Sequence, residues 1–393
     1  MKRISLFLAL LIVGTSPAIA APKSVAAKKL TIITTVSAES MVVSGKTIIT
    51  ISNSDGVNSN ILLTGMDISG AQLWQKTIDS GVDEIALASA VDPLGNVWLA
   101  GASSAIPVVE SATAPVQAEN PDGVVAEPVT KLRGDMNQLT LWKLSPLGDL
   151  LGTYTLSQSA PALISAVSVN ASGVSIVGQL LEKPFVVSAT SNGVFGKVIS
   201  IGTSKTALGA IVRHSDGSVS VFGSSAETLG GKKLAGVRDG VLIRVSKTGA
   251  IASVVRSSAP KANRTWLAAD STLALTGFVK SGKIVETAFT KFTMAFAPTW
   301  TMRVPSLGTS TVLTAGNTTY GAISSSAAVP GVIGWKPTSA SVLLLTLDSK
   351  GVVSGAYGSS EIAEPISMAY SKELGVVGLA KTAAQTLSLF KLA

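Results

Sequence analysis

Glycines recur at nearly constant spacing along this chain. They flank short apolar runs rich in Val, Ile, Leu and Thr, a composition typical of β-strands. Because glycine readily adopts a positive φ angle, these positions suit tight turns between strands. A fixed period of this kind is the signature of a repeat architecture. The glycine pairs, 24 or 25 residues apart, are Gly70 and Gly95, Gly148 and Gly173, Gly193 and Gly217, and Gly351 and Gly375.

The apolar runs that open each repeat give its period. Three of the six steps between successive runs are 45 or 46 residues, and the unit at 284–321 is degenerate. A period near 45 with about four short strands suits one blade of a β-propeller. Strands such as 342–345 are apolar on both faces, as expected for sheets covered on both sides. The runs start at Ile61, Leu139, Phe185, Val241, Thr287, Val342 and Leu387.

The two ends of the chain match different halves of the repeat. The strand at 40–45 resembles the second half of a unit, and the strand at 387–392 resembles the first half. Two half units at opposite ends can form one composite blade, which removes the exposed edge strands. We therefore predict an all-β β-propeller of seven blades, six of them whole units and one composite.

Two runs carry a family resemblance. Residues 67–74 (DISGAQLW) resemble the quinoprotein-type repeat, in which a D-x-x-G turn precedes a strand bearing Trp. Residues 92–101 (DPLGNVWLAG) are similar to the repeats of bacterial secreted β-propellers. The resemblance implies a propeller fold. It implies no activity and no cofactor site, because the fold hosts many functions.

The N-terminus is typical of an export signal. Lys2 and Arg3 precede an apolar stretch at 4–13, and Ala18, Ile19 and Ala20 have the small-x-small form that signal peptidase cuts. We expect a signal peptide over 1–20, a flexible tail over 21–29 and the propeller over 30–393. The mature protein should be extracellular, periplasmic or on the cell envelope. No later stretch is long and apolar enough for a transmembrane helix, and the chain has no cysteine for disulfides or thiolate sites.

One long segment interrupts the repeat. Residues 102–136 are rich in Pro and Ala and have no strand period, so we expect a loop insertion. Shorter expansions occur at the same place in other units, so the long links should share one face. Variable loops on a rigid scaffold often carry binding residues. The candidates on that face are Arg133, Lys232, Lys233, Arg238 and Trp335.

Charge and composition limit the partners. The formal net charge is +8, but the Lys and Arg residues are scattered along the sequence. Nucleic-acid binding needs a basic stripe or patch, so we expect no nucleic-acid partner. We expect a monomer that binds an as yet unidentified protein or envelope polymer.

Catalytic chemistry has little support in the sequence. His214, the only histidine, lies in a turn sequence, so zinc and multi-histidine metal sites are not expected. We expect no cofactor and name no catalytic residue. Aspartates at the turns suit backbone capping, although two of them could form a glycosidase pair. The leading hypothesis is a binding or scaffold module, and the alternative is a carboxylate-dependent glycan hydrolase or lyase acting at the central channel. The turn aspartates are Asp67, Asp92, Asp149, Asp216, Asp270 and Asp348.

Overall fold

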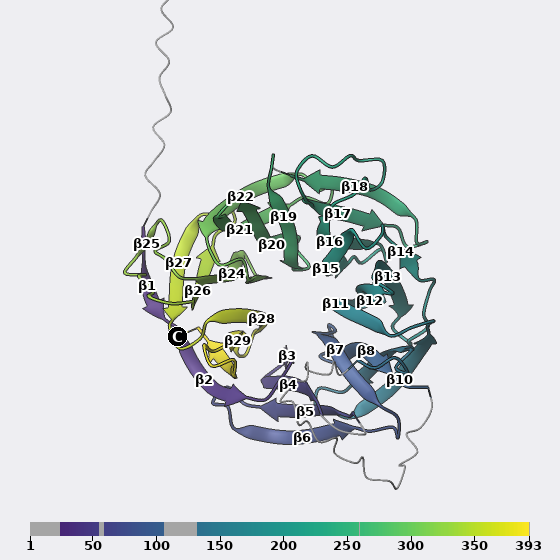
Figure 1. Cartoon of the computed structure of the whole chain (residues 1–393). Helices are drawn as coiled ribbons and strands as arrows, with labels where there is room; N and C mark the ends of the chain where they lie inside the picture. Colours follow the sequence, from purple (N-terminus) through teal and green to yellow (C-terminus); the bar gives the residue numbers. More distant parts are fainter. Residues whose placement is uncertain (1–23, 55–58, 106–131, 259, 393) are drawn as a thin grey trace, which may run out of the picture.

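The protein is a ring of β-sheets. The computed structural model describes residues 24–54, 59–105, 132–258 and 260–392. The regular elements in these ranges are all β-strands. The described residues contain no helix that is long and apolar enough to cross a membrane. The strands form six four-stranded sheets and one six-stranded sheet, arranged side by side around a common centre (Figure 1). The fold is therefore an all-β β-propeller, as the repeat predicts. The expected signal peptide, 1–20, lies outside the described residues.

We name each sheet by its innermost strand. The β3 sheet contains β3 (Ser40–Ser44), β4 (Thr47–Asn53), β5 (Ile61–Met66) and β6 (Gln72–Ile78). The β7 sheet contains β7 (Glu84–Val91), β8 (Val97–Ser103), β9 (Gln138–Leu144) and β10 (Leu150–Ser157). The β11 sheet contains β11 (Ala162–Asn170), β12 (Gly173–Leu180), β13 (Lys183–Thr190) and β14 (Ile199–Ser200). The β15 sheet contains β15 (Thr206–Arg213), β16 (Val219–Ser225), β17 (Asp239–Val245) and β18 (Ile251–Ser257).

The remaining sheets complete the ring. The β19 sheet contains β19 (Asn263–Ala269), β20 (Ala274–Ser281), β21 (Ile284–Phe292) and β22 (Pro298–Pro305). The six-stranded β23 sheet contains β23 (Ser310–Ala315), β24 (Thr318–Ser325), β26 (Ser341–Leu347), β27 (Val353–Ser359), β1 (Val25–Lys29) and β25 (Val332–Ile333). The β28 sheet contains β28 (Glu364–Ser371), β29 (Gly375–Lys381), β30 (Leu387–Lys391) and β2 (Thr31–Val36).

The β28 sheet joins the two ends of the described chain. Strand β2 pairs antiparallel with β30, with Thr31 opposite Lys391 and Val36 opposite Leu387. The N-terminal partner of the last strand is thus 31–36 rather than the predicted strand at 40–45, which forms β3 of the next sheet. Both segments are short apolar runs bounded by Thr or Ser, so pattern alone does not separate them. The described part of the expected flexible tail is also a strand, since β1 pairs parallel with β27.

The core lies between neighbouring sheets. Every residue of β8, β16 and β26 is buried, as expected for strands that are covered on both sides. Aliphatic side chains from the β11 and β15 sheets form one shared cluster that includes Val177, Val186, Val241 and Ile243. Burial of such clusters between sheets is the main favourable term that holds the ring together.

The repeat glycines serve two different purposes. Those at the turns have positive φ angles, for example +87° at Gly70 and +84° at Gly95. The glycine that ends a unit instead lies opposite a β-bulge in the first strand. A Cβ at Gly101 would lie 1.9 Å from the carbonyl oxygen of Ile85, beside the register shift between Ala86 and Ala88. Only glycine permits this backbone approach, and Gly178, Gly223 and Gly277 are in the same position.

Candidate functional site

The two faces of the ring differ in the length of their connections. One face of the ring carries two kinds of connection: those from the second to the third strand of a sheet, and those from the last strand of one sheet to the first strand of the next. We call this the loop face. Three of its links span 34, 13 and 15 residues, at 104–137, 226–238 and 326–340. On the opposite face, the turn face, the described connections are no longer than the eight residues of 191–198. The long links therefore share one face, as the sequence predicts.

The described end of the first long link is attached through Arg133. Its Nη2 donates hydrogen bonds to the carboxylates of Asp83 and Asp135, and the Asp83 carboxylate is fully buried. These hydrogen bonds, first that to Asp83, raise the pKa of Arg133. Met136, next to this group, is also fully buried. Arg133, a predicted binding residue, is thus an anchor of its link. The part of the insertion at 106–131 lies outside the described residues.

The second long link is attached through Arg256 on β18. Arg256 is almost buried and pairs with the buried Asp239 at 3.1 Å. Its Nε donates to the backbone carbonyl of Lys232 at 3.0 Å, and its Nη2 donates to the carbonyl of Glu227. Arg238 in the same link donates to the Lys205 carbonyl at 3.2 Å. The link is therefore held in one conformation while the side chain of Lys232 stays exposed.

The third long link is attached through Trp335. This side chain is only 8% exposed, and its ring covers Gly358 on β27, where a Cβ would lie 2.0 Å from the ring. Trp335 belongs to the core cluster that also contains Phe289 and Leu343. Most of its ring is therefore occupied by packing, which agrees with its large size and with its place beside a glycine.

Lysines that are far apart in sequence meet on the loop face. Strand β19 packs against β15, β16 and β17, so the β15 and β19 sheets are neighbours. Five exposed lysines lie at the loop-face end of these two sheets, and none forms an ion pair with a described residue. These lysines look scattered in the sequence because two strands and a turn separate each group from the next. The exclusion of nucleic acid, which relied on that scatter, stays a prediction. These lysines are Lys232, Lys233, Lys261, Lys280 and Lys283.

The turn aspartates are engaged by the backbone. The Asp67 Oδ1 accepts hydrogen bonds from the Ser69 hydroxyl and the Ser69 and Ala71 amides. These bonds, the Ser69 hydroxyl first, lower the pKa of Asp67. The amides of Val352 and then Lys350 do the same for Asp348. A general acid of a glycosidase needs a raised pKa, so these two turn carboxylates are unsuited to that role.

His214 does not form a catalytic triad. Its Nε2 lies 2.7 Å from the Ser220 hydroxyl, but Ser220 is fully buried and inaccessible to a substrate. Asp216 accepts hydrogen bonds from the Ser218 amide and hydroxyl instead. Burial, and then the charge of Arg244, lower the pKa of His214. Within the described ranges, no group of three His, Cys, Asp or Glu residues could hold a metal ion.

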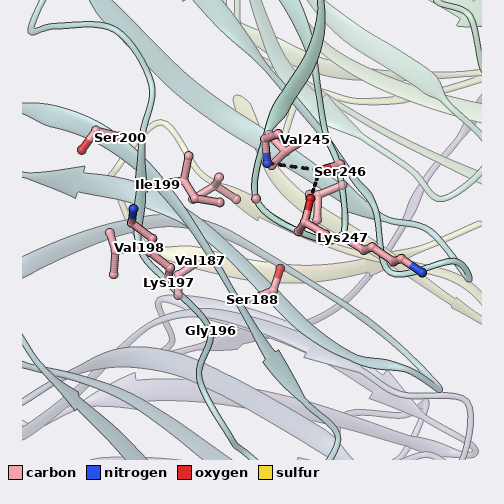
Figure 2. Close-up of a pocket in the computed structure, with 15 residues that line it drawn as sticks. Val187, Ser188, Gly196, Lys197, Val198, Ile199, Ser200, Val245, Ser246 and Lys247 are labelled. Carbon is pink, nitrogen blue, oxygen red and sulfur yellow. Dashed lines mark hydrogen bonds between the residues drawn. The ribbon is translucent and has the colours of Figure 1, made fainter.

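A cavity of about 600 Å³ lies between the β11 and β15 sheets. Its lining includes both residues of the fourth strand, β14, which is only two residues long. Figure 2 shows Val187, Ile199 and Val245 in its wall, with Ser188, Ser246 and Lys247 around them. Its described lining contains two lysines, Lys197 and Lys247, but no carboxylate or histidine. The cavity thus offers no pair of groups for acid and base catalysis.

Comparisons with known proteins address the fold. No family model matches the chain, and no curated protein matches it. The WD40 domain of Toxoplasma gondii coronin is 13% identical, with a TM-score of 0.51 over 95% of this chain and 89% of that chain. The β-propeller domain of the Trilobed protease from Pyrococcus furiosus is 10% identical, with a TM-score of 0.49 over 93% and 98%. At this identity the coronin likeness concerns the fold alone, and it agrees with the sheet arrangement: the chain has a β-propeller fold.

Proposed function

We propose that this protein is a binding module that holds a protein or polymer on its loop face. The supporting observation is that the three long links lie on one face and that buried groups attach each of them to the ring. Binding loops that are already ordered lose less conformational entropy when a ligand binds. The connections of the opposite face are shorter, and two of them, 191–198 and 246–250, contribute to the lining of the cavity between the β11 and β15 sheets.

The charge of the loop face favours an anionic partner. Two of the five exposed lysines, Lys232 and Lys233, lie in the anchored link 226–238, and the other three lie at the loop-face end of the neighbouring β19 sheet. Exposed Leu234 and Val237 in that link add apolar contact area. A cationic surface of this kind raises the rate at which an anionic polymer or an acidic protein surface associates. An acidic envelope polymer fits both this charge and the expected export.

We also infer the finer architecture and the location. Each of the sheets is one blade, which makes a seven-bladed ring with the β28 sheet as its composite blade. The resemblance of 92–101 to bacterial secreted propeller repeats and the sequence of 1–20 support export. Mass spectrometry of the N-terminus of protein recovered from the medium or envelope tests this: a chain that begins at Ala21 supports export, and one that begins at Met1 refutes it.

Binding is tested by co-sedimentation of the mature protein with isolated envelope and polysaccharide fractions. The test variant is K232S/K233S, which removes two exposed charges from the loop face. The matched control is K46S/K350S, which removes two exposed lysines from turns on the opposite face. We expect the wild type and the control to sediment with a fraction and the test variant to sediment at least threefold less. Equal sedimentation of both variants, or none by the wild type, would contradict the proposal.

A third form shows whether the first long link takes part. Residues 106–131 are replaced by a short Gly-Ser linker, and Arg133 is retained. Removal of Arg133 would leave the buried Asp83 without its cation and would confuse binding with stability. Reduced sedimentation of this form places part of the binding surface on the link at 104–137.

A further inference from the structure

Arg264 is a buried cation at the loop-face end of β19. The residue is 8% exposed, and it follows Asn263 at the start of the strand. It lies opposite Val279 of β20. Its backbone amide donates to the carbonyl of Arg238 at 2.9 Å, which joins β19 to the link at 226–238. The side chain therefore lies where the β15 and β19 sheets meet.

The guanidinium of Arg264 has no anionic partner among the described residues. Its Nε is enclosed and has no hydrogen-bond partner. The ion pairs of the described chain do not include it. The two Nη atoms are not among the enclosed, unpartnered atoms, and no described group accepts a hydrogen bond from them, so they reach the surface. Arginines buried to this degree are usually paired.

The charged side chains near Arg264 do not neutralise its guanidinium. Burial, and secondly the positive charge of Arg303, lower the pKa of Arg264 to about 10. The side chain still carries its charge at neutral pH. The acidic side chain on the same sheet, Glu286, contacts Arg303 at 3.6 Å instead. Glu286 therefore offsets the charge of Arg303 rather than that of Arg264.

The guanidinium of Arg264 has one favourable contact, with an aromatic ring. The guanidinium carbon lies 4.5 Å from the ring centroid of Trp266. Gly240 makes room for this stack, since a Cβ there would lie 2.8 Å from the Trp266 Nε1 and 3.3 Å from the Arg264 Cγ. A cation–π contact offsets only part of the cost of desolvating a charge. The guanidinium therefore has an aromatic neighbour but no carboxylate partner among the described residues.

We propose that Arg264 binds an oxyanion, a carboxylate, sulfate or phosphate group of the ligand, at the junction of the β15 and β19 sheets. A guanidinium is a planar fork of N–H groups that can match two oxygen atoms, and the two Nη atoms of Arg264 are the ones that reach the surface. The exposed Lys261, Lys280 and Lys283 at the same end attract anions to the site. This inference rests on the proposed function, because it assumes that the ligand binds at the loop face.

The test measures thermal unfolding of the purified mature protein in sodium phosphate, sulfate and acetate, each against sodium chloride at equal ionic strength. The test variant is R264M, which retains the apolar stem and removes the charge. The matched control is R244M. Arg244 also stacks on a ring, that of Phe296, but it donates to the Met294 carbonyl on the turn face. Phosphate and sulfate stabilise most proteins without binding, so saturation is the criterion.

We expect a saturable rise of roughly 2 to 4 °C in the unfolding midpoint for the wild type and for R244M, and none for R264M. In chloride, R264M should be at least as stable as the wild type, because an unpaired buried charge has been removed. The three salts show which oxyanion is preferred. Equal responses of R264M and the wild type, or marked destabilisation of R264M in chloride, would overturn the proposal. K232S/K233S should keep the anion response even if envelope binding fails, which separates the two proposals.

Discussion

The packing of Phe390 against Gly378 gives a quantitative test of side-chain packing in the β28 sheet. The two residues are directly opposite on β29 and β30 of the β28 sheet, which joins the two ends of the described chain. Phe390 is fully buried in a cluster with Leu344 and Val376. A Cβ at Gly378 would lie 2.1 Å from its ring. The phenyl ring of Phe390 therefore fills the space that a side chain at position 378 would need.

The expected energies follow from this geometry. Phe390→Ala removes a buried ring and should lower the free energy of unfolding by about 3–5 kcal/mol. Gly378→Ala forces the ring to move and should cost about 1–3 kcal/mol. In the double variant the new methyl group enters space that the ring has left. Its stability should therefore be close to that of Phe390→Ala alone, with a coupling energy of about 1–3 kcal/mol.

Urea unfolding monitored by circular dichroism, with linear extrapolation, measures all four proteins of the cycle. Gly134→Ala is the control, because a Cβ there meets nothing within 4 Å. In the double variant with Phe390→Ala, the two changes in the free energy of unfolding should add to within about 0.5 kcal/mol. Additive effects of Gly378→Ala and Phe390→Ala would refute the shared-space reasoning.

Three further predictions concern single residues. The pKa of His214 is lower in the folded protein than in the unfolded chain, so the unfolded chain binds a proton more readily. The free energy of unfolding should therefore fall as the pH drops below about 6.5. Thermal melts from pH 7.5 to 5.5 should show this fall, and His214→Gln should abolish it. Gln385 is exposed with a φ angle of +63°, so Gln385→Gly should raise the free energy of unfolding by about 0.5–1 kcal/mol in a urea titration, and a loss would contradict the strain. Asp83→Asn weakens the buried hydrogen bonds from Arg133 and from the Ser59 amide and should cost about 1–3 kcal/mol by the same assay; a cost below about 0.5 kcal/mol would mean that the pair does not anchor the link.

Part of the fold could be predicted because glycine has a specific mechanical role. The positive φ angles at Gly70 and Gly95 are the reason for the spacing that reveals the repeat. The role of Gly101 could not be predicted, because it depends on a bulge in a different strand. The degenerate unit escaped the pattern since Phe296 occupies the turn position, with a φ angle of +60°. Its ring packs against Phe222 at 5.9 Å, which supports this unusual conformation.

The candidate site was less accessible to sequence reasoning. The location of the long links followed from the repeat, because equivalent links leave a propeller on the same face. Whether a side chain in a link is an anchor or is exposed depends on tertiary contacts, as Arg133 and Lys232 show. Arg264 gave no signal at all. In the sequence it is one polar residue at the start of a strand, and only the packing of two sheets makes it buried and unpaired.

The central claim is that ligands contact the loop face. The most direct measurement is amine-labelling footprinting by mass spectrometry, with the mature protein alone and mixed with each envelope or polysaccharide fraction. If the account is right, Lys232, Lys233 and Lys283 lose reactivity in at least one fraction, while Lys46 and Lys350 on the turn face react as before. Protection confined to Lys46 and Lys350, or equal protection of both faces, would contradict it.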